Sequence, residues 1–285
     1  MTTSPVSVLA PWPLRGRSIQ RIARQEIRDA LLGWGVYLTA GAGLLLAVLL
    51  VYNSARFVAG SGLQILARPF LSPLVAASTL ALLYVTVVAT LAIARPREQG
   101  ALQVLFFAPV DAIGLVGAYF VAGIVVYLLL VLLLVPLLVL LALLTNVFLP
   151  PALLWGLLPS VGVAGLAVAF GIFLSAVAGS SRSAVLLLVT VVILLFAIQG
   201  GYTALLNVPP TSRYYDALLF LRVFLRVLND LLLWVSPIGM LGHCLDAALR
   251  NDLLLLLRDS VRAVAVSLVW LGLAVWAVRR RGVLP

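Results

Sequence analysis

Residues 95–110 read RPREQGALQVLFFAPV, a short charged island between two long apolar runs. The apolar run before it covers residues 70–94, and the run after it begins at Ala112. Each run is long enough to cross a bilayer, since a spanning helix needs about 20 apolar residues. The island is therefore predicted to turn the chain at a membrane surface, where a partner could bind it.

The composition indicates that lipid is the main solvent of this chain. Of its 285 residues, 64% are hydrophobic and 10% are charged, and the mean hydropathy is +1.21. A soluble domain of this length could not bury so much apolar surface. The net charge of +10 is assigned to arginines that face anionic headgroups of the lipid bilayer, so no nucleic-acid partner is expected.

Six membrane-spanning helices are expected, which predicts an all-α membrane protein. The expected spans are residues 30–52, 70–94, 112–145, 152–178, 183–206 and 261–278. The third apolar run, residues 112–149, is too long for one straight crossing and contains Pro136, a residue that kinks helices. We expect one long bent helix there, with two tight crossings as the open alternative. Residues 1–29 are assigned to a cytoplasmic N-terminal segment and residues 30–285 to a single transmembrane domain.

The arginines predict the orientation of the spans. If the N-terminus lies inside, the short inner segments hold Arg15, Arg17, Arg21, Arg24, Arg28, Arg95, Arg97, Arg182, Arg279, Arg280 and Arg281. An excess of arginine near the cytoplasmic ends of spans is the positive-inside bias. Both termini are therefore expected in the cytoplasm, in a multi-pass protein of a prokaryotic-type plasma (inner) membrane.

Residues 17–32 are predicted to form a basic amphipathic helix before the first span. Arg17, Arg21, Arg24 and Arg28 recur at three- and four-residue steps, and isoleucine and alanine side chains recur on the opposite side. Such a helix is suited to lie in the headgroup plane. It is either a docking element or a surface anchor that only sets topology, and its periodicity favours neither.

Missing residue types exclude several classes of active site. All 19 basic residues are arginine, so the chain has neither a P-loop lysine nor a Schiff-base amine. His243 and Cys244 are the only histidine and cysteine, which is too few for a zinc site. No catalytic residue, metal or cofactor is therefore expected on this chain. The apolar cores of the six spans contain no Asp, Glu, Arg or His, which argues against proton- or sodium-coupled transport.

The island itself is predicted to form a short surface helix. Leu102, Leu105 and Phe106 fall on one face at three- and four-residue spacing, and Arg97 and Glu98 supply polar contacts. A short helix with one apolar edge and a charged start suits insertion into a groove of another protein. An ordinary hydrated loop is the alternative.

The residues of the island also match a known signature. The pattern Ala94-Arg95-x-Arg97-Glu98-x-Gly100-x-Leu102-x-x-Leu105-x-x-x-Pro109-Val110 resembles the permease subunits of type 2 ABC exporters, which have the type V exporter fold. In that family, the segment between spans two and three commonly reads Glu-Arg-Glu-x-Gly-Thr-Leu-Glu, followed by Leu and Pro-Val. The register matches without a gap, although Pro96, Ala101 and Gln103 replace Glu, Thr and Glu. The helix before span one, the six-span layout and the long outer segment before span six are also similar.

The resemblance implies a permease that pairs with a second copy, identical or different. It also implies a separate cytoplasmic ABC ATPase, which would bind ATP and Mg²⁺. The segment coupled to this ATPase would comprise Arg97, Glu98, Gly100, Leu102, Leu105 and Phe106. Closure of the ATPase pair would push the segment and open a path outward. The alternative function is a membrane anchor or assembly subunit that holds a cytoplasmic partner without transport.

Two further sets of residues lie inside the spans. The stripe Ala167, Gly171, Ser175 and Gly179 is predicted to let helices pack closely. Since spans two and five tend to face the cavity in the resembling family, the possible pathway residues are Tyr84, Thr86, Thr90, Thr190 and Gln199. Each of these could instead form a hydrogen bond with a neighbouring helix. The apolar composition of the spans suits lipidic or drug-like cargo.

Residues 214–235 could pass for a seventh span, but they carry Arg222 and Arg226 near their centre. Each arginine would cost about 2.5–3.5 kcal/mol at the centre of a spanning helix. A helix in the outer leaflet is therefore expected, and the resemblance implies re-entrant helices at this place.

Overall fold

A computed structural model describes residues 12–61, 70–100, 111–145, 149, 151–208, 215–250 and 252–281 of this chain. Within these ranges the regular structure is entirely helical. The helices are α1 (Trp12–Leu32), α2 (Trp34–Ser61), α3 (Leu71–Leu91), α4 (Ala94–Glu98), α6 (Ala112–Thr145), α7 (Pro151–Trp155), α8 (Leu157–Val177), α9 (Ser181–Leu206), α10 (Tyr215–Val235), α11 (Pro237–Leu249) and α12 (Leu253–Arg281). Six segments, in α2, α3–α4, α6, α7–α8, α9 and α12, are long and apolar enough to cross a bilayer. The chain is thus a helical multi-pass membrane protein, as predicted.

The third span is one long helix and not two tight crossings. α6 runs for 34 residues through Pro136 without a break. Leu134 and Leu138, on either side of the proline, are both buried against the same bundle. The prediction of a single long helix is confirmed, and the alternative of two crossings is wrong. At 1.5 Å per residue the helix extends about 50 Å, more than the roughly 30 Å of a hydrocarbon core.

α8 is the central helix of the bundle. It packs against α3, α6 and α12, and residues 163–169 are buried without exception. Glycines permit this close approach: a side chain at Gly123 of α6 would meet the Val168 methyl groups at 2.7 Å. Trp270 of α12 closes the other side, with its ring centroid 5.2 Å from that of Phe170 and 4.9 Å from that of Phe173. Much of this packing depends on small residues, as expected of helices that associate in lipid.

α12 begins earlier than the sequence predicted. The last span was expected from Val261, but the helix starts at Leu253, and the Asp252 carboxylate accepts a hydrogen bond from the backbone N–H of Leu255 at 3.2 Å. Arg258 and Asp259 lie within the early turns of this helix. Asp259 is buried, with its Oδ1 3.6 Å from Nε of Arg258. Both residues precede Val261, so the predicted apolar core of the last span is unchanged, although the helix is longer than that core.

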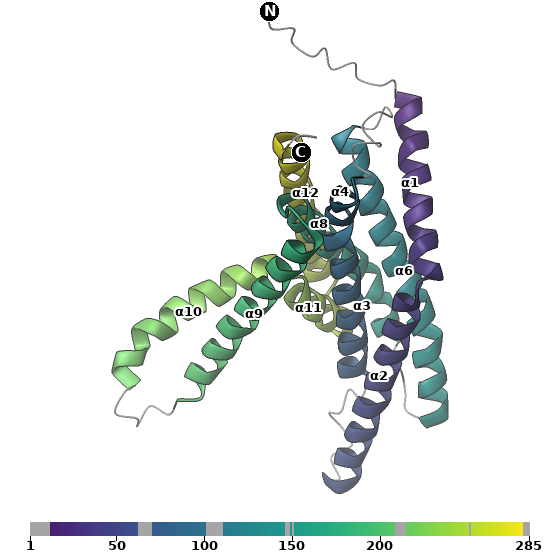
Figure 1. The fold of residues 1–285 in the computed structure, drawn as a ribbon. Helices are drawn as coiled ribbons and strands as arrows, with labels where there is room; N and C mark the ends of the chain where they lie inside the picture. The colour runs from purple at the N-terminus through teal and green to yellow at the C-terminus, as the bar shows by residue number, and fades with distance from the viewer. Residues whose placement is uncertain are drawn as a thin grey trace, which may run out of the picture.

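α1 does not lie apart from the bundle. It runs lengthwise beside the first turns of α6 and leads into α2 after a break at Gly33 (Figure 1). Ala23 on its apolar edge is buried, and Ile19 approaches Gly114 of α6. The sequence predicted a helix that lies in the headgroup plane, whereas the structure packs the apolar edge of α1 against α6. The physical reason is that small residues on both helices allow them to pack closely.

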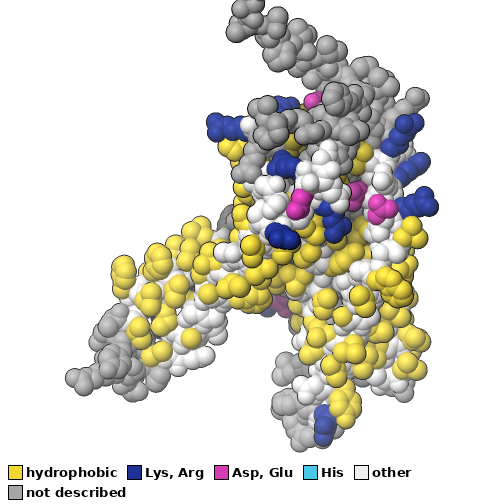
Figure 2. All heavy atoms as spheres, viewed as in Figure 1, with side chains coloured by type: hydrophobic (Ala, Val, Ile, Leu, Met, Phe, Trp, Pro, Cys, Tyr) yellow, Lys and Arg dark blue, Asp and Glu magenta, His cyan; other side chains and the backbone are white. Residues whose placement is uncertain are grey.

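The two ends of the described chain share one end of the bundle, since α1 begins and α12 ends there (Figure 1). Most charged side chains visible in Figure 2 gather at this same end, and apolar side chains cover the surface beyond it. α9 and α10 lie side by side and extend away from the other helices (Figure 1). Leu186, Ile193 and Phe196 of α9 are exposed accordingly. We call the end with the charged side chains the charged end.

Candidate functional site

The candidate site is the short helix α4 at the charged end. α3 ends at Leu91, two residues form a turn, and α4 covers the beginning of the island. Gly100 has a φ of 71°, a left-handed conformation that favours glycine and ends the helical path. The positions Leu102, Leu105 and Phe106 lie outside the described residues, so their predicted apolar face stays a prediction.

A buried serine anchors the beginning of α4. The Oγ of Ser175, near the end of α8, accepts hydrogen bonds from the backbone N–H groups of Ile93 at 3.0 Å and Ala94 at 2.9 Å. Ile93 is the N-cap residue of α4 and Ala94 is its first residue, and the helix itself offers no acceptor for these N–H groups. Ser175 is itself completely buried. One side chain thus fixes the place where α4 starts.

Arg97 points inward to the turn between α8 and α9. Its Nη1 donates to the carbonyl oxygen of Ala178 at 2.8 Å and to that of Ala176 at 3.4 Å. These carbonyls belong to the end of α8, where the helix dipole favours a positive charge. The sequence predicted that Arg97 contacts a partner, which stays a prediction, and the structure shows its guanidinium in contact with the chain itself.

Glu98 makes the complementary contact with the next helix. Its Oε2 accepts a hydrogen bond from the backbone N–H of Ser181, the first residue of α9, at 3.1 Å. A carboxylate is favourable at a helix N-terminus because unpaired N–H groups and the dipole both attract it. Ser180 and Ser183 complete this end as a capping box. Neighbouring charges of opposite sign therefore bind the end of one helix and the start of the next.

The polar groups that remain exposed around α4 define the chemistry of this surface. Arg95, Glu98 and Gln99 are exposed on the α4 side, and Arg182 is exposed on α9. The positive charge of Arg182 acts on the Glu98 carboxylate. Figure 2 shows basic and acidic side chains together at this end. The surface is hydrophilic and positive on balance, and it contains no titratable pair arranged for catalysis among these residues.

α1 borders the same end and carries the predicted basic face. Arg21, Arg24 and Arg28 are exposed, while Arg17 lies among residues whose side chains are not described. Glu26 faces inward to a small pocket between α3 and α6, which Tyr119 also lines. Burial raises the pKa of Glu26, the nearby Asp29 raises it further, and the positive charge of Arg95 lowers it in part.

The possible pathway residues fall into two groups that lie on different parts of the structure. Thr86 and Thr90 of α3 are buried and donate to the carbonyl oxygens one turn earlier, and Tyr84 packs closely against Gly35. Thr190 and Gln199 lie on α9, where Thr190 is exposed. The first group thus packs within the bundle, and the second lies on the helix that extends away from it.

Three members of the small-residue stripe are buried in the bundle. A side chain at Gly171 would meet the carbonyl oxygen of Thr86 at 2.7 Å, so α8 and α3 touch through backbone there. Ala167 and Ser175 are also buried, whereas Gly179 is exposed in the turn before α9. The stripe of small residues predicted only a packing role for Ser175. The four-residue spacing of the small residues was visible in the sequence. The hydrogen bonds of Ser175 were not, because the two N–H groups that it accepts from belong to a segment about 80 residues away.

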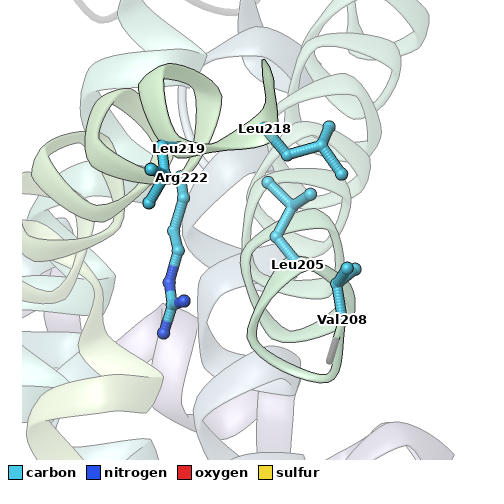
Figure 3. A pocket seen from close by; sticks show the side chains of 5 residues that line it. All are labelled: Leu205, Val208, Leu218, Leu219 and Arg222. Carbon is cyan, nitrogen blue, oxygen red and sulfur yellow. The ribbon is translucent and has the colours of Figure 1, made fainter. Parts of the chain in front are cut away.

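α10 is amphipathic, and its arginines do not face the same surroundings. Arg222 extends from α10 into a small pocket between α10 and the end of α9, which Leu205, Val208, Leu218 and Leu219 also line (Figure 3). Arg226 is exposed. Long basic side chains can cover apolar surface with their stems while the charged head reaches water. This arrangement is typical of a helix at a membrane boundary.

No protein-family model matches this chain, and no curated protein matches it.

Proposed function

We propose that this chain is the membrane permease subunit of an ATP-driven ABC exporter. α4 and the residues after it couple the bundle to a separate cytoplasmic ATPase, which binds ATP and Mg²⁺. The charged end faces the cytoplasm in this arrangement, in keeping with its many arginines. The protein belongs in a prokaryotic-type plasma membrane, with both termini inside.

The observation that carries the proposal is the attachment of α4 to the α8–α9 turn. Ser175, Arg97 and Glu98 connect α4 to two helices that enter the membrane. A force applied to α4 at the surface would therefore reach α8 and α9 directly. An ordinary hydrated loop has no need of such contacts, whereas a segment that transmits movement does.

The remaining parts of the proposal concern the path and its exit. A second copy pairs with this chain, and the path forms where α9 presents Thr190 and Gln199 beside the exposed apolar surface of the helix. α10 and α11 cap the exit as re-entrant helices in the outer leaflet, which the amphipathic character of α10 supports. Lipidic or drug-like molecules are the proposed cargo.

The test is the stimulation of ATP hydrolysis. The full chain is reconstituted in nanodiscs with the P-loop ATPase that copurifies with it, and hydrolysis and cargo transport are measured together. We expect the Glu98→Arg variant to uncouple hydrolysis from transport, because the new positive charge would face the N-terminus of α9. Asp29→Arg is the matched control, since this carboxylate is exposed near the end of α1 and takes no part in the contacts between α4 and the α8–α9 turn.

Two outcomes would contradict the proposal. If the wild-type chain binds the ATPase and changes neither hydrolysis nor transport, it is an anchor or assembly subunit. If Glu98→Arg and Asp29→Arg behave alike in both assays, α4 does not couple the two proteins.

A further inference from the structure

The turn between α8 and α9 and the helix α4 form one surface, although about 80 residues separate them in the sequence. The Oγ of Ser175 binds the start of α4, the Arg97 guanidinium binds the carbonyl oxygen of Ala178, and Glu98 binds the N–H of Ser181. Ala94, Ala178 and Ala184 also make a small buried cluster of their own between these parts. Contacts thus join α4 to both sides of the turn.

The side chains left outside these contacts come from both parts. Arg95 and Gln99 are exposed on the α4 side, and Arg182 and Ser183 are exposed at the start of α9. Arg97 is turned inward, so the positive charge presented outward comes from Arg95 and Arg182. Because these two arginines outnumber Glu98 in this group, the surface is complementary to an acidic partner surface.

We propose that the α8–α9 turn is part of the docking surface for the cytoplasmic ATPase, together with α4. Arg182 and Arg95 contact an acidic patch of that protein. Arg97 and Ser175 are positioning residues that hold the two parts of the surface in register. The identity of the partner rests on the proposed function, whereas the composite surface rests on the hydrogen bonds described above.

A protein fits this surface better than a lipid headgroup does. A segment seated in the headgroup region offers apolar side chains beside its cations. Residues 97–100 are instead polar or glycine, and the surface includes the Glu98 carboxylate beside the start of α9. The Glu98 carboxylate would repel an anionic phospholipid, whereas a protein partner can supply donors for it.

The first experiment measures binding. The full chain in nanodiscs is tested by biolayer interferometry against the copurifying P-loop ATPase, at low and at physiological salt. Arg182→Glu is expected to weaken binding by at least about tenfold, because it places like charges against each other. The affinity should also depend less on salt than that of the wild type. Arg250→Glu is the control, because Arg250 is an exposed arginine at the end of α11 and pairs with Asp246 at 2.7 Å.

The second experiment measures the positioning role in the permease alone. Spin labels at positions 99 and 183 report the distance between α4 and α9, in a Cys244→Ser background that removes the buried native thiol. Arg97→Gln and Ser175→Ala are each expected to broaden the distance distribution. Arg97→Lys should restore a narrow distribution, because an ammonium group can still donate to the carbonyl oxygen of Ala178.

The outcomes separate this inference from the proposed function. Binding by Arg182→Glu equal to that of the wild type overturns the composite surface, even if Glu98→Arg uncouples transport. If both Arg97→Gln and Ser175→Ala leave the distance distribution unchanged, the positioning role of Arg97 and Ser175 is wrong. If the wild type binds no ATPase and Arg182 instead governs retention of phosphatidylglycerol in native mass spectrometry, the surface serves lipid, and the partner assignment is wrong.

Discussion

The contact between α8 and α3 at Gly171 provides a quantitative test of the packing. A Cβ atom at this position would lie 2.7 Å from the carbonyl oxygen of Thr86, 2.8 Å from Cβ of Ala89 and 3.2 Å from the backbone N of Thr90. Most of these atoms belong to the α3 backbone, which cannot rotate away. In an open helix, Gly→Ala stabilises by about 0.5–1 kcal/mol, and overpacking of a core costs about 1–3 kcal/mol. Gly171→Ala should therefore destabilise the protein by roughly 0.5–2 kcal/mol.

Two other glycines serve as controls in the same assay, thermal unfolding of the purified chain in one detergent. Gly162→Ala should be neutral or stabilising by up to about 1 kcal/mol, because its new Cβ would have only ordinary contacts at 3.8 Å. The unfolding temperature of Gly123→Ala should lie between those of Gly171→Ala and Gly162→Ala, since its new Cβ would meet the side-chain methyl groups of Val168, which can move. An unfolding temperature for Gly171→Ala at or above that of Gly162→Ala would refute the close approach of α8 and α3.

Two further predictions concern polar groups at the charged end. Ser175→Ala should lower the free energy of unfolding by about 1–3 kcal/mol, because two N–H groups at the start of α4 lose their acceptor. The matched Ser267→Ala removes only a donor to the carbonyl oxygen of Ala263 in its own helix, so an equal loss in a detergent unfolding titration would contradict the role given to Ser175. The pKa of Glu26 is raised in the folded protein, so folding favours its protonated form. Its contribution to stability is therefore complete below the ordinary carboxyl value of 4.5 and is lost as the pH rises through the folded-state pKa. Glu26→Gln should be more stable than the wild type at pH 8. Its unfolding temperature should also change less than that of the wild type between pH 4 and pH 8. If the unfolding temperatures of both proteins change in parallel with pH, the raised pKa of Glu26 does not contribute to stability.

The hydropathy of the chain predicted the membrane class, the number of spans and the single long α6. These features depend on the length of each apolar run, which is a local property of the sequence. α6 continues through Pro136, and Leu134 and Leu138 keep its buried face on either side of the proline. The start of α12 was misjudged for a related reason. Composition alone penalises Arg258 and Asp259, but it cannot show that Arg258 is exposed at the helix surface while Asp259 is buried beside it.

For the candidate site too, the sequence predicted some features and only the tertiary structure revealed the others. The pattern of residues around Arg97 and Glu98 identified a segment of interest, and the arginine distribution suggested its side of the membrane. Neither could reveal that Arg97 binds the end of α8 while Glu98 binds the start of α9. These hydrogen bonds join residues about 80 positions apart. They form only when the helices pack, and the local residue pattern does not show which helix ends come together. Local chemistry therefore predicted which segments are apolar enough to cross a bilayer, and the packing of α4 against the α8–α9 turn decided which charged side chains are turned inward and which are exposed.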